Sequence, residues 1–242
     1  EVIRPLTDSE KDRILGGEAC QWSEFVDSVN INSRIWPRAA AIGEKLWTAS
    51  VLTEDINDMY RRLDQFKEDL AERGMNLDSI YENRLKSLAD NGSYEDLKAI
   101  MDIMEEVKYH GRMPGLLEKD ELYLPDYPLN RLVDIARPES PAARKFSQQV
   151  KEENQAAVLE SLRNWNRSAT ELEPYLSANE FLQDLDSMNH ELKLVTGALI
   201  EIREGGNSQM GDSLLLQKLN YLESGEHGLI LAVVPAFREL ME

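Results

Sequence analysis

Trp22 and Glu24 are the residues of this 242-residue chain whose types and spacing best suit ligand chemistry. An indole face packs on the apolar face of a pyranose ring, and a carboxylate two residues away accepts hydrogen bonds from neighbouring hydroxyls. The pair therefore suits a sugar-binding subsite. A plainer interpretation, in which a half-buried aromatic lies beside a surface acid, is favoured when these two residues are taken alone.

A short strand and a helix are expected on either side of this pair. The apolar residues 14–15 lead into a glycine pair at 16–17, which predicts a short buried strand that ends where the backbone needs room or a positive φ. The run 34–41 predicts a helix with Pro37 in its first turn, where the missing N–H costs nothing. Together these segments predict one βα unit with the pair in its connecting loop.

The rest of the chain has the pattern of amphipathic helices separated by glycine, proline and asparagine breaks. The expected helices cover residues 53–74, 79–89, 94–109, 129–136, 140–167, 178–203, 212–223 and 228–241. Pro235 is expected to kink or delay the last helix, and residues 111–128 are expected to form an ordered loop. The predicted fold class is mainly α, a C-terminal helical bundle preceded by one βα unit.

Composition excludes several classes of protein. The chain has 27 basic and 45 acidic side chains and a formal net charge of −18, which argues against binding nucleic acid or an anionic membrane. A single cysteine, Cys20, excludes an intrachain disulfide. The scattered histidines His110, His190 and His227 predict no metal site, and no cofactor is predicted. The first residue is Glu1 rather than methionine, which suggests that a segment upstream has been removed.

A longer pattern around the pair resembles a known family. Residues 16–27 read Gly-Gly-Glu-Ala-Cys-x-Trp-x-Glu-x-Val-Asp, residues 34–39 read Arg-x-Trp-Pro-Arg-Ala, and residues 44–47 read Glu-x-Leu-Trp. Over residues 12–48 this pattern closely resembles the last βα unit of the catalytic barrel of family 20 glycoside hydrolases, the β-N-acetylhexosaminidases. The resemblance implies a (β/α)₈ TIM barrel whose site lies at the C-terminal ends of the strands.

The resemblance also implies roles for individual residues. Trp22 matches one wall of the aromatic box around a terminal N-acetylhexosamine, and Glu24 matches a residue that hydrogen-bonds hydroxyls on the far side of that sugar. Arg34, Trp36 and Arg38 match positions that we interpret as structural. The implied activity is exo-acting hydrolysis of terminal N-acetylglucosamine or N-acetylgalactosamine from glycans, by substrate-assisted retaining catalysis. The implied location is periplasmic or extracellular, or lysosomal in a eukaryote.

The chain departs from the family because it lacks the catalytic residues. Family members carry an adjacent Asp-Glu pair after His-x-Gly-Gly, in which the Glu protonates the leaving oxygen and the Asp orients the substrate's acetamido group. Asp120-Glu121 has neither the histidine nor the glycines, so no catalytic residue is assigned in this chain. The isolated chain is therefore predicted to be inactive.

The missing motif bears on domain organisation. A TIM barrel takes roughly 250 residues, so residues 1–75 are expected to supply only its last βα unit, and residues 76–242 a C-terminal α-helical domain. The rest of the barrel is expected upstream in the same polypeptide. Residues 1–35 are predicted to be poorly ordered, or to be ordered by packing on the helical block or on another copy of the chain. The side chains expected to lose their partners without the barrel are Ile14, Leu15, Phe25, Val26, Trp36 and Trp47.

Three roles for residues 76–242 stay open. The first is a helical bundle that packs on the barrel, with homodimer formation as a further role. The second is an extension of the substrate site, in which the tyrosine-rich stretch 123–127 reaches over the barrel mouth toward a longer glycan. In the third, the whole chain is a non-enzymatic helical interaction module, although the density of the match to the family argues against it. Met101 and Met104 are predicted to belong to the helical core.

Overall fold

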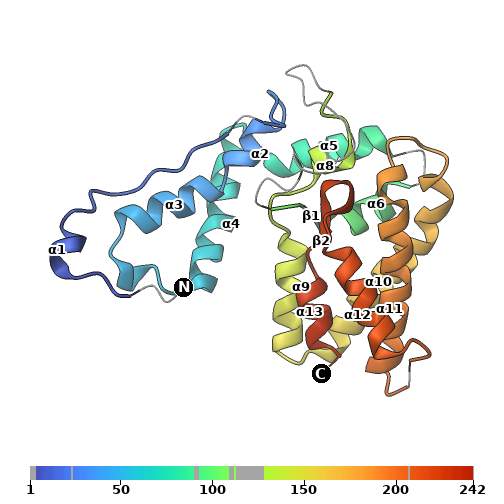
Figure 1. The fold of residues 1–242 in the computed structure, drawn as a ribbon. Helices are drawn as coiled ribbons and strands as arrows, with labels where there is room; N and C mark the ends of the chain where they lie inside the picture. Colours follow the sequence, from blue (N-terminus) through green and yellow to red (C-terminus); the bar gives the residue numbers. More distant parts are fainter. Residues whose placement is uncertain are drawn as a thin grey trace. The chain divides into compact units, whose positions relative to one another are not determined.

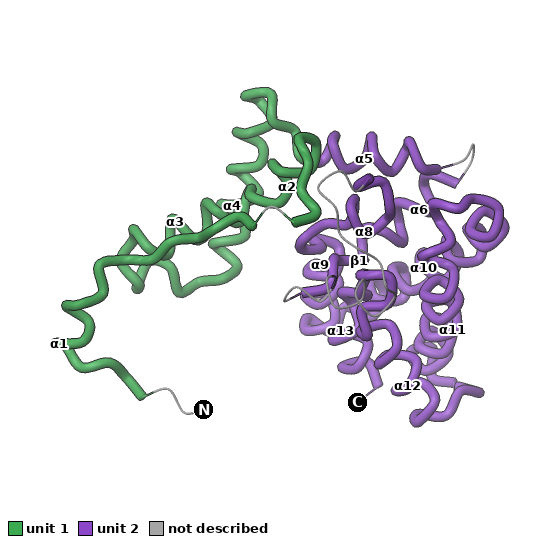
Figure 2. The backbone as a smooth tube through the Cα atoms, turned by 45° about the horizontal axis from the view of Figure 1, so that its top comes forward, with its two compact units in different colours: residues 1–77 green, residues 78–242 purple. Residues whose placement is uncertain are grey.

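The computed structural model describes residues 4–22, 24–89, 93–108, 112, 128–206 and 208–241. Helices dominate the chain (Figure 1), so the prediction of a mainly α fold is confirmed. The chain divides into two compact units, residues 1–77 (unit 1) and 78–242 (unit 2), which Figure 2 shows in different colours. None of the helices in the described part is long and apolar enough to cross a membrane.

Unit 1 consists of short helices and one longer helix, joined by irregular segments. Its elements are α1 (Asp8–Lys11), α2 (Ile31–Ile35), α3 (Arg38–Trp47), the 3₁₀ turn η1 (Ser50–Leu52) and α4 (Ile56–Glu72). The helix predicted around Pro37 begins directly after it, at the start of α3. Helix α4 begins three residues later than predicted, because Asp55 rather than Thr53 caps it and accepts hydrogen bonds from two amide groups of its first turn.

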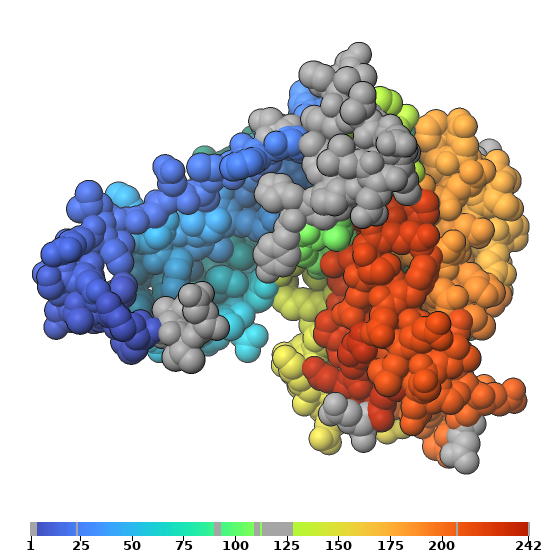
Figure 3. Space-filling view, viewed as in Figure 1, coloured from blue at the N-terminus to red at the C-terminus, as the bar shows by residue number. Residues whose placement is uncertain are grey.

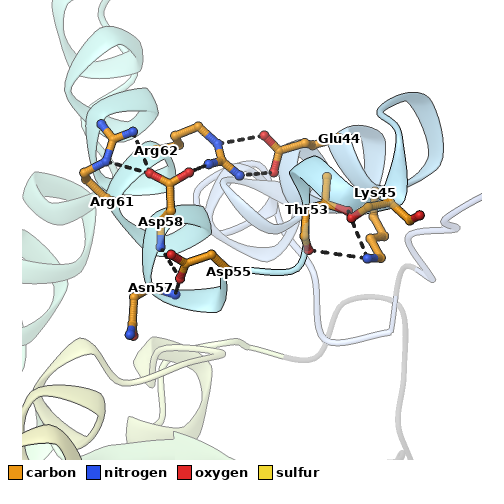
Figure 4. A network of polar contacts seen from close by, with 9 residues as sticks. Glu44, Lys45, Thr53, Asp55, Asn57, Asp58, Arg61 and Arg62 are labelled. Atoms are coloured by element: carbon orange, nitrogen blue, oxygen red, sulfur yellow. Dashed lines mark hydrogen bonds and ion pairs between the residues drawn. The ribbon is translucent and has the colours of Figure 1, made fainter.

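Polar contacts join α3 to α4 (Figure 4). Arg62 on α4 donates from Nε and Nη2 to the carboxylate of Glu44 on α3, both at 2.8 Å, and contacts Asp58 on its own helix. The hydrogen bonds from Arg62 lower the pKa of Glu44. Lys45 donates to Oγ1 of Thr53 at 2.9 Å, which ties the end of α3 to the turn before α4. These contacts support two helices that have no fully buried residue.

The strand predicted at Ile14 and Leu15 is not formed. Both side chains are exposed, and this part of the chain has no regular secondary structure up to residue 22. A strand needs a neighbouring strand for its N–H and C=O groups, and the described residues of unit 1 contain none. The glycine prediction is confirmed, because Gly16 has a φ of +152° and a Cβ on Gly17 would lie 3.1 Å from a methyl group of Leu46.

Several large apolar side chains of unit 1 are exposed. Leu15 is 100% exposed and Trp47 is 94% exposed, as expected for residues that lack their partners. The prediction is wrong for Phe25, which is buried, and for Trp36, whose ring lies 5.7 Å from that of Phe66. In Figure 3 the first described residues of the chain, in the darkest blue, lie at one edge of unit 1.

Unit 2 is a helical bundle with one small sheet. From α5 onward its elements are α5 (Leu77–Leu88), α6 (Tyr94–Met101), β1 (Met104–Glu106), α8 (Leu132–Ile135), α9 (Pro141–Lys151), α10 (Gln155–Leu176), η2 (Gln183–Leu185), α11 (Asp186–Arg203), α12 (Asp212–Leu222), η3 (Glu226–Gly228), β2 (Leu229–Leu231) and α13 (Val234–Glu239). The two longest helices, α10 and α11, pack side by side (Figure 1). Met101 and Met104 are fully buried in the core, as predicted.

An aromatic cluster holds three helices of unit 2 together. The ring centroids of Phe146 on α9 and Trp165 on α10 lie 4.8 Å apart, and Phe237 on α13 lies 5.7 Å and 6.0 Å from them. All three side chains are buried. Aromatic pairs in such edge and tilted arrangements add to the free energy gained by burial. The cluster therefore joins α9, α10 and α13 in the core of unit 2.

Two predicted helices are shorter than expected because their ends pair as strands. Residues 104–106 and 229–231 form the antiparallel strands β1 and β2, with Met104 opposite Leu231. The chain turns into β2 at Gly228, whose φ is +78°. Pro235 lies in the first turn of α13, so the last helix begins at residue 234 rather than at 228.

Other boundaries also differ from those predicted. Ser140 caps α9 as expected, and its Oγ accepts a hydrogen bond from the amide of Ala143 at 2.9 Å. The helix predicted over 140–167 is two helices, because Glu153 takes a φ of +53° and Asn154 caps a new helix. The helix predicted over 178–203 starts at residue 186, after η2. Of the loop predicted over 111–128, only residues 112 and 128 lie among the described residues.

Candidate functional site

Trp22 and Glu24 lie on the irregular segment that joins α1 to α2 in unit 1. Trp22 is 65% exposed, whereas Glu24 is half-buried. An exposed indole offers a flat apolar face, and a carboxylate offers two acceptor oxygens for sugar hydroxyls. The segment therefore carries both kinds of group that the predicted subsite needs.

The chain changes direction directly after Glu24. Phe25 has a φ of +56°, in the left-handed region that bulky residues seldom adopt, and its side chain is buried. Such a backbone conformation persists only where the surrounding structure holds it. The buried side chain of Phe25 therefore anchors the loop, whereas the side chain of Trp22 is mostly in solvent.

Two side chains fix the backbone beyond Phe25. Asp27 accepts hydrogen bonds through Oδ1 from the amides of Val29 at 2.8 Å and Asn30 at 2.7 Å, which turns the chain into α2. Asn30 reaches back in the opposite direction: its Nδ2 donates to the carbonyl of Phe25 at 3.1 Å, and its Oδ1 accepts from the amide of Asp27 at 2.9 Å. Asn30 is only 3% exposed. We refer to these contacts of Asp27 and Asn30 as the 25–30 latch.

The residues that follow the latch make contacts within unit 1. Arg34 on α2 is buried, and Arg38 donates from Nη2 to the carbonyl of Arg34 at 2.5 Å. Trp36 lies between α2 and α3 and packs against Phe66 of α4. The segment that carries Trp22 and Glu24 thus continues into a helical support on which its last residues are anchored.

Not all residues singled out in the sequence belong to the described part of the structure. Asp120, Glu121, the stretch 123–127 and His110 lie outside the described residues. Cys20 is exposed, with a free thiol. The described residues contain no group of three or more His, Cys, Asp and Glu side chains arranged to hold a metal ion.

Asp184 in unit 2 is a partly buried acid whose pKa is shifted. The carboxylate of Asp184 accepts hydrogen bonds from Nε and Nη2 of Arg131, at 2.7 Å and 2.5 Å. Nδ1 of His227 lies 3.2 Å from Oδ1 of Asp184. Burial alone would raise the pKa of Asp184, but its contacts with His227 and Arg131 outweigh burial and lower the pKa well below its usual range. Because Arg131 precedes α8 and His227 lies in η3, this carboxylate joins separate parts of the unit and we interpret it as structural.

Sequence reasoning missed the latch. Asp and Asn are residue types that favour turns and helix starts, and Asp27 and Asn30 stand just before α2. That signal was available in the sequence. The hydrogen bond from Asn30 back to Phe25 could not be read from the sequence, since it depends on the left-handed turn at Phe25.

Comparisons with known proteins find a family match at the start of the chain. Residues 3–50 match the model of the glycosyl hydrolase family 20 catalytic domain. This segment of the chain is therefore similar to part of the catalytic domain of this family of glycoside hydrolases.

Two relatives show how much of the chain is matched. The chain is similar to beta-hexosaminidase subunit beta of Sus scrofa, with 43% identity over 77 residues, which is 32% of this chain and 14% of that protein. It is also similar to subunit beta of Homo sapiens, with 41% identity over 83 residues, 33% of this chain and 15% of that protein. The matched part is thus a small share of these relatives' length.

A solved structure resembles nearly all of the chain in fold. The chitobiase of Flavobacterium johnsoniae aligns with a TM-score of 0.85 and 24% identity, covering 98% of this chain and 36% of that one. At this identity the likeness concerns the fold alone. It extends the similarity beyond residues 3–50 into the helices of unit 2.

Proposed function

We propose that this chain is the C-terminal part of an exo-acting β-N-acetylhexosaminidase, which removes terminal N-acetylglucosamine or N-acetylgalactosamine from glycans. The observation that carries the proposal lies at residues 22 and 24–30, inside the segment matched to the catalytic domain. There an exposed Trp22 and a half-buried Glu24 precede the turn that the latch holds. Trp22 stacks on the sugar ring, and Glu24 accepts hydrogen bonds from its distal hydroxyls.

The bond-breaking residues belong to the rest of the polypeptide. In the proposed mechanism a Glu there protonates the leaving oxygen, while a neighbouring Asp orients the substrate's own acetamido group as the nucleophile. Trp22 and Glu24 hold the sugar in place for that step but exchange no proton with it. The isolated chain is therefore inactive in this account.

The partner of unit 1 in this proposal is the upstream barrel of the same polypeptide. Exposed side chains such as Leu15 and Trp47 are the surface that it covers. Unit 2 is a helical domain that folds on its own core and supports this end of the barrel. The glycan substrate places the enzyme outside the cytoplasm, in the periplasm, the extracellular space or the lysosome.

Hydrolysis of 4-nitrophenyl N-acetyl-β-glucosaminide tests the proposal. The 242-residue chain alone is expected to release no nitrophenol, whereas the full-length protein turns the substrate over. In the full-length protein, Trp22→Ala is expected to raise KM about tenfold or more because the stacking contact is lost.

Trp22→Phe is the matched variant. It keeps an aromatic face and is expected to recover part of the affinity. Unchanged kinetics in Trp22→Ala would remove Trp22 from the sugar site, and turnover by the 242-residue chain alone would contradict the division of roles.

A further inference from the structure

Asn30 has a buried side-chain amide whose donor and acceptor groups both form hydrogen bonds with the loop that follows Glu24. Its donor binds the carbonyl of Phe25, and its acceptor binds the amide of Asp27. Only a side chain with a donor and an acceptor at this reach can make both bonds, because Asp lacks the donor, Ala lacks both, and Gln is one methylene longer. The residue type therefore matches its position in the loop.

Asn30 is itself held firmly. Its amide donates to Oδ1 of Asp27, and its carbonyl accepts hydrogen bonds from Oγ of Ser33 at 2.7 Å and from the amide of Arg34 at 3.1 Å. These bonds fix the backbone of Asn30 to the start of α2. A side chain that projects from such a rigid support transmits its position to whatever it binds.

What Asn30 binds is the turn next to Glu24. The carbonyl of Phe25 belongs to a residue in the left-handed conformation, which a bulky side chain adopts only when held. Releasing this carbonyl allows Phe25 to relax, and the backbone that sets the direction of Glu24 relaxes with it.

We infer that Asn30 is a positioning residue: through Phe25 it aims Glu24 at the distal hydroxyls of the sugar and so sets how well the enzyme recognises them. The inference rests on the function proposed above. It goes beyond that function because it assigns a specificity role to a residue that does not touch the substrate.

The test compares a substrate with two of its deoxy analogues in the full-length enzyme. The ratio of kcat/KM for the nitrophenyl glycoside to that for its 4-deoxy and 6-deoxy analogues measures recognition of the hydroxyls. Asn30→Ala is expected to lower this ratio about tenfold, because a hydrogen bond from a hydroxyl to a carboxylate depends on the aim of the carboxylate. A ratio equal to that of the wild type would overturn the inference.

A double-mutant cycle separates positioning from general destabilisation. In the Glu24→Gln background, Asn30→Ala is expected to change the ratio no further, since Asn30 acts through Glu24. Fully additive losses would show that Asn30 does not act by this route. Asn189→Ala is the control, because Asn189 is fully buried in unit 2, donates to the carbonyl of Ala169 and lies outside the proposed site. It should lower the melting temperature but leave the ratio unchanged.

A measurement independent of activity keeps the two proposals apart. Hydrogen exchange on the 242-residue chain is expected to be slow at the amide of Asp27 and at least tenfold faster in Asn30→Ala, because the accepting Oδ1 is gone. If that variant fails to fold, Asn30→Asp keeps the acceptor for the amide of Asp27, while it replaces the donor to Phe25 by a carboxylate oxygen that repels the carbonyl. This variant should have a lowered ratio of kcat/KM between the glycoside and its deoxy analogues, while hydrogen exchange at the amide of Asp27 stays slow.

The two failures give different results. Equal exchange at Asp27 in the wild type and Asn30→Ala would overturn the inference whatever the kinetics. A full-length enzyme with no hexosaminidase activity would instead overturn the proposed function and, with it, the role of Asn30 in specificity. The hydrogen-exchange result on the latch would still stand.

Discussion

The two units of the chain differ in where their large apolar side chains lie. Unit 2 buries large apolar side chains from most of its helices in one core, which includes the cluster of Phe146, Trp165 and Phe237. Unit 1 leaves Leu15 and Trp47 almost wholly in solvent and joins its two main helices through charged contacts. The difference indicates that unit 2 has a hydrophobic core of its own, whereas unit 1 exposes apolar surface of the kind that commonly marks an interaction site.

Truncating the aromatic cluster is expected to have the largest effect. Phe146→Ala should lower the free energy of unfolding by about 3–5 kcal/mol, because it removes a fully buried ring and leaves a cavity between α9, α10 and α13. Urea denaturation followed by circular dichroism measures the loss. A loss below about 1 kcal/mol would mean that unit 2 lacks the tight core described here.

Removing the cap of α9 should have an intermediate effect. Oγ of Ser140 accepts from the amide of Ala143 and donates to the carbonyl of Asp102 at 2.5 Å, so Ser140→Ala breaks two buried contacts. A loss of about 1–2 kcal/mol is expected in the same urea experiment. Ser140→Thr keeps the hydroxyl and should recover most of it. Equal stability of Ser140→Ala and the wild type would contradict this role of the hydroxyl.

Acid should weaken unit 2 partly through Asp184. Its pKa is lowered in the folded state, so its contribution is present above its unfolded-state pKa and is lost as the pH falls through the folded-state pKa. Asp184→Asn is therefore expected to flatten the decline of stability below about pH 4. Urea midpoints measured down this pH range test it, with the exposed Glu160→Gln as control. Parallel pH curves for Asp184→Asn and the wild type would exclude the contribution.

The smallest change in stability is expected on the exposed face of unit 1. Trp47→Ser should change the unfolding free energy of the 242-residue chain by less than about 0.5 kcal/mol, because the indole is in solvent. The variant should also bind less of an apolar dye. Strong destabilisation would mean that Trp47 is buried and would remove the contrast between the units.

The helices could largely be predicted from the sequence because capping and periodicity are local signals. Ser140 caps the helix it was expected to cap, and Met101 and Met104 are in the core. The strands β1 and β2 could not be predicted, since each exists only through pairing with a segment more than a hundred residues away. Conversely, the strand expected at residues 14–15 has no partner among the described residues of unit 1.

For the candidate site, the residue types could be predicted but their support could not. Trp22 and Glu24 stand out by type and spacing, whereas Asn30 gains its proposed role only from the left-handed turn at Phe25. A conformation of that kind is stabilised by contacts that span the loop. No local propensity of phenylalanine indicates it.

The central claim is that unit 1 is completed by a catalytic barrel in the same polypeptide. The mass of the native protein, together with the reading frame upstream of Glu1, tests it most directly. The account predicts a much longer polypeptide that carries His-x-Gly-Gly followed by Asp-Glu ahead of this segment. A native polypeptide that begins near Glu1 would contradict the account and leave Trp22 and Glu24 without catalytic partners.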